Sequence, residues 1–340
     1  MPVCGVIIYM KVLLLGASGL LGHNVLQRLV ACGHNVVAVM RHPDAIQVEG
    51  IDYKCVVGRI DHAATVIAAA EGCDAIVNCA GVTDMSLLHR EDYQTINCDL
   101  CSTIVDAMKC HGIKNLVHAS TVNTIGYGSE GHPADENEPA RSPFADSYYA
   151  DSKREGESIL LDAALNNTDW HVIIVNPGYM IGPMDVKPSS GRLLLAAYKN
   201  RLMLAPSGGK AFVDVRDVAV AMVNALERGH NGYRYIAVNS HGCFTVKELY
   251  EMQAEVMGYR QKVMVVPDGF LLAAGAIGDI MRRIGIRTEL STVNVRQLMA
   301  HEYYDNSHAI SDLGLPETPI AQAIRDFHAW RNGKKTRNKI

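Results

Sequence analysis

The sequence predicts an α/β protein with a doubly wound parallel sheet and a smaller, mainly helical C-terminal part. From Lys11 to Gly178, short apolar runs alternate with segments of helical periodicity. Such alternation is typical of strand–helix–strand units, whose right-handed crossovers build a parallel sheet. This regular alternation ends after Gly182-Pro183, where irregular loops and mainly helical segments follow. We therefore expect one domain over residues 1–182, with later returns near 211–240, and a second, smaller part over residues 183–340.

The composition favours a folded protein of the cytoplasm. The 340 residues are 48% hydrophobic with a formal net charge of -4, so the chain can bury a sizeable core and carries no basic footprint for nucleic acid. The nine cysteines are odd in number and scattered, which predicts reduced thiols. Cys98 and Cys101 form a Cys-x-x-Cys pair, but no second pair stands at zinc-like spacing, so we expect ordinary thiols and no metal.

No segment is predicted to enter a membrane. The longest apolar stretch, Gly269–Gly278, is much shorter than the ~20 residues of a membrane-spanning helix. Residues Met1 to Tyr9 are apolar but lack the charged region of a secretory signal and run straight into the first strand. Met10 is an alternative first residue.

The first strand and helix carry the strongest motif. An apolar run, Lys11–Leu15, stops at a glycine, and a helical pattern extends from Leu20 to Cys32. In a Gly-x-x-Gly-x-x-Gly turn, the first glycine allows the tight turn, the second lets backbone approach a phosphate, and the third lets the helix lie close to the strand. The N–H groups of the first helical turn then face an anion. This predicts a Rossmann-type dinucleotide site, against the alternative of a plain turn, formed by Gly16, Ser18, Gly19, Leu20 and Gly22.

The second strand, Asn35–Met40, bears on which dinucleotide binds. An acidic side chain at its end would accept a hydrogen bond from the 2′-hydroxyl of NAD. Here Arg41 follows the strand, and no carboxylate appears before Asp44. Because a guanidinium pairs well with a phosphate, Arg41 favours NADP over NAD. The alternative is an arginine on a loop surface.

The remaining elements continue the alternation. In the first domain we expect four further strands and three helices: Tyr53–Val57, Asp74–Asn78, Asn115–Ala119 and His171–Val175, with helices Thr65–Ala70, Asp92–His111 and Ser147 to about Leu165. After Pro183 we expect helices Arg192–Lys199, Val218–Arg228 (capped by Asp217) and Val246–Met257, with strands Ala211–Val215, Tyr233–Val238 and Lys262–Val266. The rest, to about Asn332, is predicted to be mainly helical.

Three of these strands end in residues suited to a ligand. Small residues follow the fourth strand at Cys79-Ala80-Gly81, where a cofactor can pass close to the backbone. Hydroxyls follow the fifth strand at Ser120-Thr121, and Asn176-Pro177-Gly178 follows the sixth. Ligands bind at the carboxyl ends of strands in open parallel sheets, so we expect these residues to share one edge.

A tyrosine and a lysine stand four residues apart on a predicted helix. Tyr149 and Lys153 therefore share a face. A phenol has an ordinary pKa near 10, and an ammonium one turn away favours the phenolate and lowers that value. A hydroxyl of Ser120 or Thr121 can hold a substrate carbonyl oxygen beside the phenol. The alternatives are a core aromatic and a solvated lysine; Tyr148 lies four before a serine, so we expect it to pack or to line the substrate.

The order of these parts resembles the short-chain dehydrogenase/reductase superfamily. The motifs are the glycine turn, Asn78-Cys79-Ala80-Gly81, Ser120-Thr121, Tyr149-x-x-x-Lys153 and Asn176-Pro177-Gly178. The length, Gly182-Pro183, the run Phe212 to Ala219 and the late Ser307-His308-Ala309 run are similar to its extended branch. That branch comprises the NAD-dependent epimerase/dehydratase and dihydroflavonol-reductase-like proteins. The run Val39 to Pro43 is more similar to the dihydroflavonol-reductase-like group.

The resemblance implies a hydride moved between a nicotinamide and a carbinol carbon. Tyr149 would exchange the proton, Lys153 would tune Tyr149 and bind the nicotinamide ribose, and Thr121 would polarise the carbonyl. Asn97 matches a position tied to helix geometry. Cofactor contacts would come from the glycine turn and from Arg41, Ala80, Gly81, Pro177 and Gly178. The family often has an acidic residue where Arg59 stands, which leaves only Asp61 for an adenine-side contact.

Three functions stay open at this point. The first is an NADP-preferring carbonyl reductase or alcohol dehydrogenase acting on a small molecule. The second is an NAD-dependent sugar-nucleotide epimerase, although the run Asn123-Thr124-Ile125-Gly126 lacks the tyrosine that precedes the glycine in many sugar epimerases. The third is a non-catalytic dinucleotide-binding regulator, which would not need Tyr149 and Lys153. In each case the helices beginning at Asp92 and Tyr148 are candidates for a homodimer interface.

Overall fold

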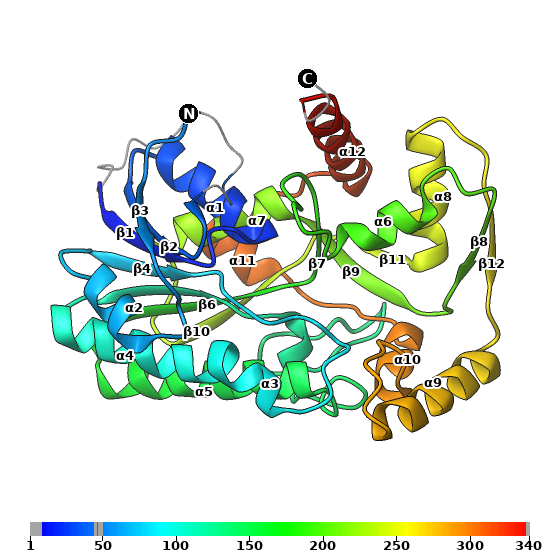
Figure 1. Cartoon of the computed structure of the whole chain (residues 1–340), viewed down its shortest axis with the longest axis horizontal. Coiled ribbons are helices and arrows are strands. Elements are labelled where there is room, and N and C mark those ends of the chain that lie inside the picture. Colours follow the sequence, from blue (N-terminus) through cyan, green and yellow to red (C-terminus); the bar gives the residue numbers. More distant parts are fainter. Residues whose placement is uncertain (1–8, 44–45, 47–49, 338–340) are drawn as a thin grey trace.

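The computed structural model describes residues 9–43, 46 and 50–337, so the expectation about residues 1–8 lies outside the described residues. Its centre is a seven-stranded parallel sheet in the order β10-β6-β5-β4-β1-β2-β3 (Figure 1). The strands are β1 (Lys11–Leu15), β2 (Asn35–Met40), β3 (Lys54–Val57), β4 (Ala75–Asn78), β5 (Asn115–Ala119), β6 (His171–Pro177) and β10 (Tyr233–Ala237). This order, which reverses between β1 and β4, confirms the predicted doubly wound fold.

The strands are apolar on both faces because helices cover both sides of the sheet. In β1, Val12 and Leu14 face one core, whereas Leu13 and Leu15 face the other. Figure 1 shows α1, α7 and α11 on one face and α2, α4 and α5 on the opposite face. These helices are α1 (Leu20–Ala31), α2 (Ala63–Ala69), α4 (Leu100–His111), α5 (Tyr148–Asn166), α7 (Val215–Asn224) and α11 (Ser307–Leu313).

The helix expected over Asp92–His111 is interrupted. It consists of α3 (Glu91–Gln94), a π-helical turn (Thr95–Asp99) and α4. Asn97 lies in that turn, where its amide accepts from Val82 N (2.9 Å) and donates to Val82 O (3.1 Å) and Ser152 Oγ (2.9 Å). The turn packs so closely on α5 that a Cβ on Gly156 would lie 2.2 Å from Asn97 O. Asn97 thus fixes both the loop after β4 and the position of α5.

The C-terminal part combines helices with two small sheets. One sheet has the order β11-β9-β7, and a parallel pair joins β12 to β8. The strands are β7 (Tyr179–Ile181), β8 (Leu202–Ala205), β9 (Gly209–Asp214), β11 (Cys243–Thr245) and β12 (Lys262–Val265). The helices are α6 (Gly191–Ala197), α8 (Val246–Val256), α9 (Asp268–Arg283), α10 (Thr292–Met299) and α12 (Ile320–Arg337). Among the helices described, none is both long and apolar enough to cross a membrane.

The cap of α7 differs from the expectation. Strand β9 stops at Asp214, which is three residues earlier than the expected cap at Asp217, and the helix begins at once. The Asp214 carboxylate therefore caps α7 by accepting from Arg216 N at 2.8 Å. Asp217 lies within the first turn and instead accepts from Thr318 N (2.7 Å) and Thr318 Oγ1 (2.8 Å).

Candidate active site

The glycine turn after β1 is held by close backbone packing. Gly16 has a φ of 80°, and a Cβ there would lie 2.5 Å from Ala80 N. A Cβ on Gly22 would lie 2.1 Å from Gly16 O, so only glycine lets α1 sit this close to the turn. Gly19 precedes α1 in extended backbone, and a Cβ there would meet nothing closer than Gly16 O at 3.4 Å. The space in front of Gly19 therefore stays open toward the helix N-terminus.

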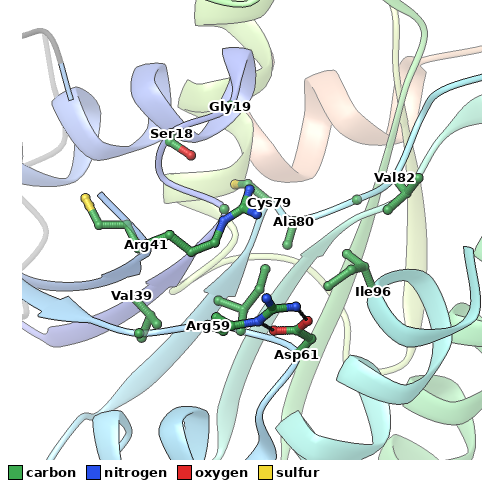
Figure 2. A pocket seen from close by; sticks show the side chains of 15 residues that line it. Ser18, Gly19, Val39, Arg41, Arg59, Asp61, Cys79, Ala80, Val82 and Ile96 are labelled. Atoms are coloured by element: carbon green, nitrogen blue, oxygen red, sulfur yellow. Dashed lines mark hydrogen bonds and ion pairs between the residues drawn. The ribbon is translucent and has the colours of Figure 1, made fainter. Parts of the chain in front are cut away.

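A cavity of about 400 Å³ lies in front of this turn, at the carboxyl ends of β1 to β4 (Figure 2). It brings together seven of the predicted cofactor residues: Gly16, Ser18, Gly19, Arg41, Asp61, Ala80 and Gly81. Leu20, Gly22, Pro177, Gly178, Tyr149 and Lys153 do not line it. Arg59, Val82 and Ile96 line it without having been predicted to do so. The position is the point of strand-order reversal, where open parallel sheets bind ligands.

Among the described residues, two arginines and one aspartate are the charged groups that line the cavity. Figure 2 shows Arg41 extending from the end of β2 toward the glycine turn. Arg59 forms an ion pair with Asp61, with Nε 2.9 Å from Oδ1. That hydrogen-bonded guanidinium lowers the pKa of Asp61 to about 2. Because this ion pair neutralises Asp61, the charge left over at this end of the cavity is the positive charge of Arg41.

Tyr149 and Lys153 project from the first turns of α5. Lys153 is buried, and its Nζ donates to Ala119 O at 2.8 Å. Tyr149 is half-buried beside Tyr93, with ring centroids 6.4 Å apart. Tyr148 is 47% exposed and does not pack in the core.

The pKa of Tyr149 differs from the expectation. Burial raises it to about 12, and a hydrogen bond with Thr121 acts in the opposite direction. The expected lowering by Lys153 is absent because desolvation of the phenolate outweighs the other effects and the lysine is bonded to β5. The arrangement therefore holds a protonated phenol across the neutral pH range.

The hydroxyl pair after β5 lies on a rigid support. Thr121 precedes a 3₁₀ turn (Val122–Thr124), and its hydroxyl accepts from Asn123 N at 3.3 Å. Its carbonyl oxygen accepts from Asn176 Nδ2 at 3.0 Å. Ser120 Oγ is buried and has no hydrogen-bond partner within the described part of the chain. These contacts fix Thr121, and its side-chain hydrogen bond with Tyr149 brings the two residues together. The hydroxyl of Ser120 stays unused within the described part of the chain.

Pro177 and Gly178 lie at the end of β6, the strand beside β5. Pro177 is the last residue of that strand and pairs with Ala237 of β10. A Cβ on Gly178 would lie 2.3 Å from Ala211 O, so the backbone of β9 requires this glycine. The close packing of Gly178 thus serves the junction between the two parts of the chain.

Two buried polar residues near Lys153 were not predicted. His118 Nε2 lies 3.2 Å from Lys153 Nζ, and His118 Nδ1 lies 3.0 Å from Asn78 Nδ2. Burial, with the neighbouring lysine, lowers the pKa of His118 well below its ordinary value. Asn78 begins the Asn78-Cys79-Ala80-Gly81 motif, whereas the signal for His118 is a polar residue in the apolar strand β5.

Cys98 in the π-helical turn and Cys101 on α4 are part of the packing. Cys98 Sγ donates to Ser152 O at 3.2 Å, and Cys101 Sγ donates to Asn97 O at 3.5 Å. Both thiols are buried and free. Within the described residues, no group of three or more His, Cys, Asp or Glu side chains is placed to hold a metal ion.

Comparison with known proteins identifies similar sequences and folds. The model of the NAD dependent epimerase/dehydratase family matches residues 12–239. The chain is 28% identical over 324 residues to a Synechocystis protein named "Putative dihydroflavonol 4-reductase", covering 93% of this chain and 92% of the relative. It is 26% identical over 327 residues to the sterol demethylase protein B of Methylococcus capsulatus, covering 94% and 98%. The crystal structure of gox2253 superposes with a TM-score of 0.82 at 24% identity, covering 95% and 98%.

Proposed function

The chain belongs to the NAD-dependent epimerase/dehydratase family of enzymes, and within it we propose an NADP-preferring reductase of a carbonyl to a secondary alcohol. The proposal rests on one observation: Tyr149, Thr121 and Lys153 lie on the side of the sheet where the strands have their carboxyl ends, which is also the side of the glycine turn. The open space before Gly19 at the N-terminus of α1 fits the diphosphate of a dinucleotide. When bound, the nicotinamide supplies the hydride.

The residues of the chain supply a proton and orientation. Tyr149 donates its phenolic proton to the carbonyl oxygen, a step that general acid catalysis accelerates about 10²–10⁴-fold. Thr121 hydrogen-bonds the same oxygen, and Lys153 orients the nicotinamide ribose. The raised pKa of Tyr149 keeps the phenol in the protonated form that donates to a carbonyl oxygen.

The choice of NADP rests on the charges at the end of β2. Arg41 lines the cavity where an NAD-specific protein places a carboxylate. The nearest cavity carboxylate, Asp61, is already paired with Arg59, so it offers little repulsion to a 2′-phosphate. A guanidinium at this position, with no ion pair to any residue that the structure describes, supports binding of that phosphate.

The test is a fluorescence titration with NADPH and NADH of the wild type, Arg41→Ala and a control, Arg260→Ala, which changes an exposed arginine of the C-terminal part. We expect NADPH to bind more tightly than NADH and only Arg41→Ala to abolish the preference. A screen of aldehydes, ketones and sugar nucleotides then follows. Equal affinity of the wild type and Arg41→Ala for NADPH would contradict the role of Arg41.

A sugar-nucleotide epimerase is the competing reading, and the same experiments separate the two. An epimerase returns the hydride to its substrate, so it retains NAD through purification and shows no net oxidation of NADPH. A homodimer through the helices that begin at Asp92 and Tyr148 and a cytoplasmic location stay predictions. Sedimentation of the purified protein tests the dimer.

A further inference from the structure

Helix α9 turns its bulky apolar side chains outward. Phe270, Ile277, Ile280 and Ile284, the last of which directly follows the helix, are 72%, 60%, 60% and 70% exposed. Their spacing along the chain places all four on one side of the helix, and we call them the outer face of α9. An amphipathic helix of a globular protein normally turns such a face toward the core. The outer face of α9 therefore calls for an apolar environment outside the described part of the chain.

Glycines fill the opposite side of α9, where the helix packs on α10 and the residues just before it. Gly275 and Gly278 are buried. A Cβ on Gly278 would lie 2.1 Å from Leu290 O, and one on Gly275 would lie 3.1 Å from Thr292 Cα. Small residues thus lie at the contact between the helices, and large apolar residues face outward. This arrangement is typical of helices whose surroundings are lipid.

The ribbon formed by β8 and β12 exposes a second apolar surface. Leu204 pairs with Met264, and Leu202 pairs with Lys262. Leu202, Leu204 and Met264 are all exposed, because paired residues point to the same side of the two strands. Strand β12 leads into α9, and Figure 1 shows both at the edge of the C-terminal part that lies away from the large sheet. Of the sixteen large apolar side chains that are exposed among the described residues, ten lie between Leu202 and Leu290.

The charges available beside the outer face of α9 are basic. Arg283 lies one turn after Ile280, and Arg287 follows the helix; both are exposed and form no ion pair with any residue that the structure describes. The nearby carboxylates are each bonded to another residue: Asp268 to Ser207, Asp279 to Thr292 and Glu289 to Arg192. An apolar face with cations at its edge is complementary to the acyl chains and phosphates of an anionic bilayer.

We propose that the outer face of α9 and the β8–β12 ribbon dock on an anionic lipid bilayer, with the helix lying along its surface. The apolar side chains enter the outer part of the acyl region, and Arg283 and Arg287 meet lipid phosphates. The apolar stretch Gly269–Gly278 belongs to this helix and is too short to span a bilayer. A helix that lies along the surface, however, needs only one apolar face.

The docking helix is bonded to the loop that forms a wall of the cofactor cavity. Arg282 donates to Met85 O at 3.3 Å and to Leu87 O, and Asn294 of α10 donates to Met85 O at 3.2 Å. Val82, three residues before Met85, lines the cavity. The docked face and the cavity wall are therefore joined by side-chain hydrogen bonds, whichever reaction the enzyme performs.

The first test is vesicle flotation of the purified full chain, with vesicles of phosphatidylcholine alone or mixed with phosphatidylglycerol. We expect the protein to float with the mixed vesicles and to float less with phosphatidylcholine alone. The double variant Ile277→Ser, Ile280→Ser should bind about tenfold less because it loses apolar groups that enter the bilayer. The control is Val57→Ser, an exposed residue at the end of β3. No flotation of the wild type, or unchanged flotation of the double variant, would overturn the proposal.

The second test removes the cations. The double variant Arg283→Ala, Arg287→Ala should lose about fivefold in binding to mixed vesicles for each arginine, and little in binding to phosphatidylcholine alone. The wild type should lose a similar amount at high salt, because salt screens the attraction. Arg325→Ala, which changes an exposed arginine of α12, is the control and should bind as the wild type does. Equal binding of the wild type and the double variant to mixed vesicles would contradict the charge complementarity and overturn the proposal.

The third test shows which face meets the lipid. Brominated phosphatidylcholine quenches the fluorescence of a tryptophan that enters the acyl region, so Phe270→Trp should be quenched beyond the wild type and Val57→Trp should not. Absence of this extra quenching would overturn the proposal. Sedimentation velocity without vesicles tests the competing occupant, a second copy of the chain. If Ile277→Ser, Ile280→Ser dissociates an oligomer and the wild type does not float, the outer face of α9 is an interface between copies, and the bilayer proposal is wrong.

Discussion

The two ends of the site are built in different ways. Around Tyr149, most of the polar groups are buried and hydrogen-bonded to one another, as in the chain from Ala80 through Asn78 and His118 to Lys153. Around Arg41, the side chains are more exposed, and an ion pair joins two near neighbours in sequence, Arg59 and Asp61. A buried polar group needs hydrogen-bond partners within the protein, whereas an exposed polar group can bond to water until a ligand replaces it. The first end is therefore constrained by the fold, and the second is free to set cofactor preference.

The largest effect is expected from a substitution at the buried end of the site. Tyr149→Phe removes the proton donor, and we expect kcat for carbonyl reduction to fall about 10²–10⁴-fold with little change in NADPH affinity. Tyr148→Phe is the matched control, because Tyr148 is the adjacent tyrosine and its ring is exposed. This variant should retain wild-type turnover. Steady-state kinetics measure both. Undiminished turnover of Tyr149→Phe would remove the proposed mechanism.

The next largest effect is expected at the glycine turn after β1, where α1 packs closely on the turn. A Cβ in Gly22→Ala would lie 2.1 Å from Gly16 O, so α1 must shift away from the turn. We expect a loss of about 1–3 kcal/mol in the free energy of unfolding, as for other overpacked sites, together with weaker cofactor binding. Gly131→Ala is the control because its Cβ would meet no atom within 4 Å. Urea unfolding curves measure the difference; equal midpoints for wild type and Gly22→Ala would contradict the close packing.

A smaller effect is expected at the exposed end. Arg41→Ala removes an exposed charge, and we expect about tenfold weaker NADPH binding with NADH binding unchanged, since a hydrogen bond to a charged group contributes about 1.5–3 kcal/mol before screening by solvent. The loss should shrink at high salt. A parallel loss of NADH affinity would show that Arg41 acts on the cavity shape instead of the 2′-phosphate.

The smallest effect concerns the ion pair beside Arg41. Arg59 lowers the pKa of Asp61 to about 2, so the carboxylate is charged above that pH. Because the folded-state pKa lies below the ordinary value of about 3.9, the ion pair stabilises the fold above pH 4, and this contribution is lost as the pH falls through 2. In Arg59→Ala, the pKa should return toward 3.9. Carboxyl ¹³C NMR titration measures it, and an unchanged midpoint would mean that Arg59 is not the cause.

The sequence was sufficient to predict the large sheet because its strands are buried on both faces. Each run, such as Val36 to Val39, is continuous and ends in a recognisable turn. The glycine positions and the Tyr149–Lys153 spacing were also readable, because a turn and a helical face are local. The cap of α7 was misplaced by three residues since two aspartates suit the same role, and only the end of β9 selects Asp214.

The hydrogen-bond chain beneath the site could not be read in this way. Asn78 and His118 are 40 positions apart, and they meet only because β4 and β5 pair with Asn78 directly beside His118. A shift of one residue in that register would turn one side chain to the other face of the sheet. The raised pKa of Tyr149 was missed for a similar reason, because burial is a property of the assembled fold.

The π-helical turn at Asn97 holds the loop after β4, and the helix that follows it packs into the core. The Asn97 amide hydrogen-bonds the backbone of Val82 in the loop after β4. The following helix, α4, packs into the core through Ile104. Because this anchor uses only the backbone of Val82, it does not depend on which side chains the loop carries. Side chains of the loop can therefore change without loosening this attachment of the cavity wall.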